Sequence, residues 1–183
     1  MCFENRSLGV EGAWSPFAVD VGTPPQTLQL LVSTQQSATW AVSSKGCGDA
    51  DDASNCMDAR GGLFDSEKSS SWFRKDIYQL NAAINLGYGT NEQNGTYGFD
   101  TMSLPSTSGS SSKKLDHQVI AGIATHKFYL GSIGLAPQTV NFSNSGDSSP
   151  SFISSLKEQN LIPSLSYGYN AGAYYSKKAA ILS

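Results

Sequence analysis

Turn-forming residues recur at short intervals along this chain, and short apolar or alternating runs lie between them. Alternating or apolar runs bounded by such turns are typical of β-strands. With 183 residues the chain has room for one domain of ordinary size. The sequence therefore predicts a single all-β domain. The turns lie at Gly22-Thr23-Pro24-Pro25, Gly46 to Asn55, Gly61-Gly62, Gly87 to Gly98 and Ser106 to Ser112, and the runs at Phe17 to Val21, Leu28 to Val32, Val119 to Ala124 and Ser132 to Leu135.

Two segments have helical character within this β-rich pattern. In Ser151 to Asn160, apolar residues recur at three- and four-residue spacing, and Ser149 or Ser151 can cap the start. Leu63 to Ser71 contains a charged run that suits a short turn of helix. Residues 106–114 are polar and of low complexity, which favours a flexible loop. We therefore expect one or two short helices.

The three cysteines are Cys2, Cys47 and Cys56. Cys47 and Cys56 lie close together in a Gly-, Asp- and Ser-rich stretch that we interpret as a loop, so a local disulfide is the preferred interpretation and two free thiols the alternative. Cys2 is left as a free thiol or as one half of a bond to a partner outside this chain.

Charge and composition exclude several classes of function. The net charge is −3 and basic residues are scattered, so no surface for nucleic acid is expected. No apolar run is long enough to span a membrane, and none follows Met1 as a signal peptide would require. No metal site or cofactor is predicted, because His, Cys, Asp and Glu show no metal-ligand spacing. Glycosylation sequons begin at Asn5, Asn94 and Asn141, a number little above chance.

Four segments in order carry a specific resemblance. The first is Phe17 to Gln26, with the turn Gly-Thr-Pro-Pro-Gln. In the second, two apolar residues precede Ser33-Thr34-Gln35-Gln36, and Trp40 follows seven positions after Ser33. The third and fourth are Leu86 to Thr101 and Tyr129 to Ala136. Together these segments resemble the amino-terminal lobe of pepsin-like aspartic peptidases. The resemblance implies a secreted, fungal-type member of that family that has lost its activity.

The resemblance implies a role for each segment. The third segment corresponds to the flap hairpin that closes over substrate, with Tyr88 at the flap tyrosine position and Gly89 and Thr90 after it. The fourth corresponds to the strand that threads behind the active-site loop, and residues 152–161 to the helix beyond it. Trp40 is expected in the core and the cleft wall. Asp100 matches an acidic position after the flap and is expected to be a structural acceptor.

The second segment differs from the family pattern at the catalytic motif. The family has Asp-Thr-Gly-Ser at this point, and two facing carboxylates that share a proton activate a water. Here Ser33 replaces the aspartate, Gln35 the glycine and Gln36 the serine, and only Thr34 is retained. A serine nucleophile would need a histidine base, but we expect His117 and His126 to be exposed loop or strand residues. No intact catalytic residue is therefore predicted.

Three functions remain open from the sequence. The favoured one is a catalytically inactive binding module for an extended peptide, a protein or wall polysaccharide, secreted or attached to the cell surface. The alternatives are an active aspartic endopeptidase when joined to a second lobe, and a passive structural domain of a surface protein. Residues 1–183 are expected to form one lobe with a leader at 1–13, and the family's second lobe is not in this chain.

Without a second lobe, we expect apolar surface to be left open for a partner lobe or a symmetric copy. The residues expected on this surface are Ile133, Leu135, Tyr167, Tyr169 and Tyr175.

Overall fold

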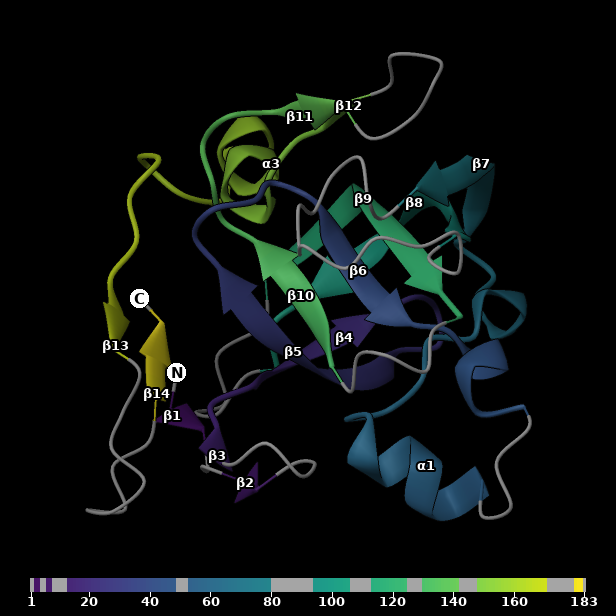
Figure 1. The fold of residues 1–183 in the computed structure, drawn as a ribbon. Helices are drawn as coiled ribbons and strands as arrows, with labels where there is room; N and C mark the ends of the chain where they lie inside the picture. The colour runs from purple at the N-terminus through teal and green to yellow at the C-terminus, as the bar shows by residue number, and fades with distance from the viewer. Residues whose placement is uncertain are drawn as a thin grey trace.

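A computed structural model describes residues 2–3, 6–7, 13–48, 53–79, 94–105, 113–124, 130–141, 148–170 and 180–182. Its centre is a seven-stranded sheet with the order β4-β5-β10-β6-β9-β8-β7 (Figure 1). Because β4 also pairs with β8, six of these strands close into a barrel and β7 lies outside it. The strands are β4 (Phe17–Val21), β5 (Gln26–Ser33), β6 (Thr39–Val42), β7 (Phe73–Gln79), β8 (Asn94–Ser103), β9 (Lys114–Ile123) and β10 (Gly131–Gly134). The predicted mainly-β architecture is confirmed.

The barrel strands alternate between two apolar clusters, as half-buried strands should. Phe17, Val19 and Val21 of β4 all point into the larger cluster, while the residues between them are half-buried. The smaller cluster takes the other face of β6, β8 and β9 and contains Trp40 and Tyr97. Each face of the sheet is therefore covered by its own set of side chains.

Helices are few and short in the described part of the chain. Helix α3 (Phe152–Glu158) begins at Ser151, whose hydroxyl accepts a hydrogen bond from the Ser154 amide at 3.2 Å. Its buried face includes Phe152 and Ile153, as the apolar spacing predicts. The 3₁₀ turn η2 (Ser66–Lys68) falls in the second segment with helical character. A further 3₁₀ turn, η1, spans Ser44–Cys47.

The loop interpretation of the cysteine-rich stretch is wrong in part, because helix α1 spans Ala53–Ala59. Gly61 and Gly62 end this segment with positive φ angles of 66° and 94°, and Gly62 donates back to the Met57 carbonyl at 3.0 Å. The Asp- and Ser-rich composition of this stretch hid the helix, since such residues usually favour turns.

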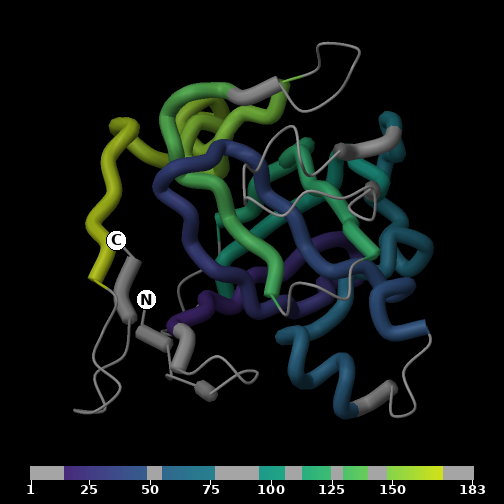
Figure 2. Tube along the Cα trace, viewed as in Figure 1, coloured from purple at the N-terminus to yellow at the C-terminus, as the bar shows by residue number. Residues whose placement is uncertain are grey.

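Small sheets surround the barrel. The strands β1 (Cys2–Phe3), β14 (Ala180–Leu182) and β13 (Tyr169–Asn170) form one sheet in that order, so the leader and the end of the chain pair with each other. Figure 2 shows the chain after α3 running down one side of the barrel to this sheet. The remaining pairs are β2 (Arg6–Ser7) with β3 (Ala13–Trp14), and β11 (Val140–Asn141) with β12 (Ser148–Ser149).

The open apolar face expected from the sequence is smaller than predicted. Ile133 and Leu135 are 0% and 1% exposed, because β10 is an interior strand packed in the main core. Tyr167 and Tyr169 are exposed as expected, and Leu165 next to them is 54% exposed. Tyr175 lies outside the described residues. Of the described residues predicted for this surface, only Tyr167 and Tyr169 are therefore open, and both lie after α3, the second of them in β13.

Candidate functional site

The four-residue loop Ser33 to Gln36, expected from the sequence to replace the family's catalytic motif, follows the turn-and-strand unit β4–β5. Ser33 is the last residue of β5 and is half-buried. Thr34 and Gln35 are exposed, Gln36 is half-buried, and Ser37 behind them is buried. The loop therefore presents neutral polar side chains to the surface at the end of a central strand.

Strand β10 passes directly behind this loop. It lies between β5 and β6, runs parallel to β5, and pairs Gly134 with Ser33. The Leu135 amide donates to the Ser33 carbonyl at 2.8 Å, and the Ala136 amide donates to the Gln36 carbonyl at 2.9 Å. The sequence prediction of a strand threaded behind the loop is confirmed.

Residue 134 must be a glycine because β10 passes very close to the backbone of the Ser33 loop. A Cβ built at Gly134 would lie 2.1 Å from the Ser37 carbonyl oxygen and 2.8 Å from the Ala38 nitrogen. Both are backbone atoms, so no side chain can move aside. The Gly134 amide also donates to the buried Thr39 hydroxyl at 3.3 Å. Thr39 is a positioning residue that the sequence analysis did not identify. The available signal was a threonine just before Trp40 in a β-rich segment, which indicates a position in a strand.

Two described aspartates, one on each side of this loop in the sequence, are engaged elsewhere. Asp20 pairs with Thr27 at the opposite end of β5 from Ser33, and it accepts a hydrogen bond from the Thr27 hydroxyl at 2.6 Å. Asp100 is 2% exposed and accepts from the Ser71 hydroxyl at 2.7 Å and from the Thr101 amide at 2.8 Å. Asp100 is thus a structural acceptor, as expected.

Histidine does not supply a base to Ser33 in the part of the chain that the structure describes. His117 is exposed on β9, as predicted, with a positive φ of 55°. Its ring lies 6.1 Å from that of Phe99, and no hydrogen bond joins it to the Ser33 loop. His126 lies outside the described residues. Among those residues, moreover, no three His, Cys, Asp or Glu side chains gather as metal ligands.

The predicted cleft and flap residues have different outcomes. Trp40 is on β6 and 4% exposed, in the smaller core with Tyr97 and Val119, so its core role is confirmed and its contact with a cleft remains a prediction. Strands β7 and β8 are antiparallel neighbours, as the arms of a flap hairpin should be. Tyr88, Gly89 and Thr90 lie outside the described residues.

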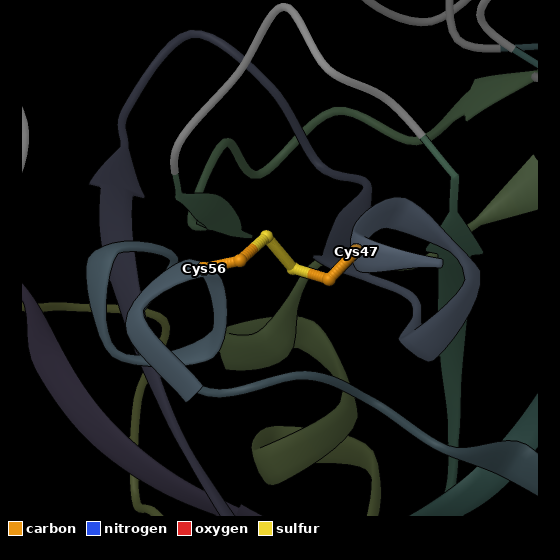
Figure 3. Close-up of a disulfide and its surroundings, with 2 residues drawn as sticks. All are labelled: Cys47 and Cys56. Atoms are coloured by element: carbon orange, nitrogen blue, oxygen red, sulfur yellow. A yellow bond between two sulfur atoms is a disulfide. The ribbon is translucent and has the colours of Figure 1, made fainter. Parts of the chain in front are cut away.

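The predicted disulfide joins Cys47 of η1 to Cys56 of α1, with Cα atoms 6.0 Å apart (Figure 3). The preferred pairing is confirmed. The bond fastens α1 to the segment that follows β6, a few residues beyond Trp40. The side chains of Cys2, Asn5, Asn94 and Asn141 lie outside what the structure describes, so their assignments remain predictions.

A barrel closed by β4 and β8, with a glycine-bearing strand threaded behind the loop after β5, defines a lobe of the aspartic peptidase type. Comparison with known proteins gives the family: residues 17–181 match the model of the eukaryotic aspartyl proteases, and the chain belongs to that family. It is also similar to mucorpepsin of Rhizomucor pusillus, at 38% identity over 86 residues. That match covers 47% of this chain but only 18% of mucorpepsin.

Proposed function

We propose that this chain is a non-catalytic member of its family that binds a ligand in the cleft beside the Ser33 loop. The observation that supports the proposal is Ser33 itself, in register with Gly134 where the family pattern has a catalytic aspartate. A serine hydroxyl is neutral at any working pH and cannot share a proton with a second carboxylate.

The neighbouring substitutions support the same conclusion. In the family a glycine two positions after the aspartate lets a backbone amide approach the reacting groups, and here Gln35 adds a long, exposed side chain at that point. Gln36 replaces a small hydroxyl with a second amide. A site with amides and hydroxyls can hydrogen-bond a polar ligand such as an extended peptide, but it has no acid–base pair to hydrolyse one.

The decisive experiment tests hydrolysis and binding on the same purified protein. We expect no hydrolysis of acid-denatured globin in acidic buffer and no binding of pepstatin. Ser33→Asp alone should not restore activity in residues 1–183, because Gln35 and Gln36 remain and these residues contain no Asp-Thr-Gly or Asp-Ser-Gly string. Pepstatin-sensitive turnover by the unmodified chain would refute the proposal. Stabilisation by a peptide or polysaccharide, about 2.7 kcal/mol at one hundred times its Kd, separates a binding module from a passive domain.

The second candidate is an active endopeptidase completed by another lobe. It is favoured by the family and by the similarity to mucorpepsin. Under this proposal the exposed Leu165, Tyr167 and Tyr169 pack against the added lobe. Activity that appears only when such a lobe is supplied would favour it over the non-catalytic proposal.

The setting we propose is extracellular. A structural disulfide persists in oxidising compartments and is rare in the cytosol. Glycans at Asn5, Asn94 or Asn141 would agree with that location, and mass spectrometry of protein from a secreting eukaryotic host tests them. No described helix is long and apolar enough to span a membrane.

A further inference from the structure

A cavity of about 490 Å³ lies away from the Ser33 loop. It is bounded by η1, by the segment around η2, and by the neighbouring strands β7, β8 and β9. None of residues 33–36 lines it. Its volume falls within the range of small-molecule sites, roughly 300–1,000 Å³.

Part of the cavity lining is apolar. Gly122 pairs with Thr96 across β9 and β8, and because it has no side chain the Phe64 ring lies close to its backbone, where a Cβ would meet that ring at 3.2 Å. The rings of Phe64 and Trp72 meet edge to face, with centroids 5.3 Å apart. Aromatic rings offer flat apolar contact area, so this part of the cavity suits a ligand with an apolar face.

The rim carries two cations without carboxylate partners among the described residues. Lys45 and Arg74 are both exposed and line the cavity, and neither forms an ion pair there. The Asp65 carboxylate is engaged by Lys68 at 3.3 Å and by the Glu67 amide at 3.1 Å. Of the cavity's charged groups, Lys45 and Arg74 are therefore available for an anion, and Glu67 for a donor.

Among the described residues, hydroxyl groups make up the rest of the polar lining. Ser43, Ser44, Ser66 and Thr96 all border the cavity. Each hydroxyl can both donate and accept a hydrogen bond. A ligand with many hydroxyls and one carboxylate would match this lining, whereas the end of an apolar peptide would use the cations and leave most of the hydroxyls to water.

We propose that this cavity binds an acidic sugar, a hexuronate unit of a polysaccharide. The apolar face of the sugar ring lies against Trp72, and its carboxylate lies between Arg74 and Lys45. The ring hydroxyls bond to Glu67 and to the surrounding serine and threonine hydroxyls. This site is separate from the Ser33 loop, so it stands whether or not the chain hydrolyses peptides.

The test uses trigalacturonate and its fully methyl-esterified form as matched probes, because only the first carries the negative charge. Binding is followed by the indole N–H signals of the protein's three tryptophans, with the Trp72 signal identified by Trp72→Phe. We expect the acid form to shift the Trp72 signal. We expect the ester to bind about tenfold more weakly or worse, the size of one lost charge-assisted interaction.

Variants locate the site. Arg74→Gln and Lys45→Gln are exposed changes that should fold normally, and each should weaken binding of trigalacturonate about tenfold. Lys114→Gln, an exposed lysine on β9 that does not line the cavity, is the matched control and should have no effect. The proposal is overturned by no binding, by equal binding of acid and ester, or by binding that neither cavity variant weakens. Tighter binding of N-acetyl-leucine than of trigalacturonate overturns it in favour of a peptide carboxylate.

Discussion

Replacing Gly134 by alanine tests whether the passage of β10 behind the loop holds this lobe together. The added Cβ would lie 2.1 Å from the Ser37 carbonyl oxygen and 2.2 Å from its carbon. The obstacle is backbone, so the loop or β10 must move. Either movement breaks the hydrogen bonds from Leu135 to Ser33 and from Ala136 to Gln36, which are 2.8 and 2.9 Å long.

Overpacking in a core costs about 1–3 kcal/mol where side chains can adjust, and a clash with fixed backbone belongs at or above the top of that range. We expect Gly134→Ala to lower the free energy of unfolding by about 3 kcal/mol or more, and the melting temperature by roughly 6–12 °C. Urea unfolding followed by tryptophan fluorescence measures the first quantity.

Gly48→Ala is the matched control for this substitution. A Cβ there meets its nearest atom at 3.5 Å, and the residue has an ordinary helical φ of −62°. It should be neutral or stabilise slightly, because alanine restricts the unfolded chain. Equal effects of the two substitutions would refute the argument, since they would show that β10 has room behind the loop.

Three further predictions concern stability and association. Replacing Cys47 and Cys56 together by serine should cost about 2.7 kcal/mol in urea unfolding, from the entropy of the short closed loop, whereas Cys2→Ser should cost little; the reverse order would exclude this pairing as the stabilising one. Ser71→Ala should cost about 1.5–3 kcal/mol because buried Asp100 loses a hydroxyl donor; an effect near zero would show that water replaces it. Light scattering should show association that rises with concentration and is reduced by Tyr169→Lys, while a monomer at all concentrations would contradict it.

The barrel was predictable from the sequence because its signals are local. Apolar residues alternate along β4, glycine and proline mark the turn before β5, and Ser151 caps α3. The disulfide followed from the short separation of Cys47 and Cys56. Each of these features is decided by neighbours in the chain.

Features set by distant contacts could not be found in this way. Ile133 and Leu135 looked like interface residues, yet they are core because β10 is inserted between β5 and β6. The cavity is lined by Gly122, Phe64 and Trp72, which come from different elements, and no local pattern marks it. Helix α1 was not predicted because its composition is typical of turns. The disulfide that joins it to η1 favours the helix more than this composition opposes it.

The contacts that hold the Ser33 loop do not depend on most of the loop's side chains. Ser33 and Gln36 are held through their carbonyl oxygens, and these bonds are the same for any side chain. Gly134, by contrast, is fixed by backbone crowding, and Thr39 by its hydroxyl bond. If the chain is non-catalytic, as we propose, side chains at 33, 35 and 36 can change at little cost in stability, whereas we expect a substitution at 134 to disrupt the loop. It follows that the requirements of stability alone would not keep a carboxylate at position 33. Gly134 is required by the fold, so its presence says nothing about activity.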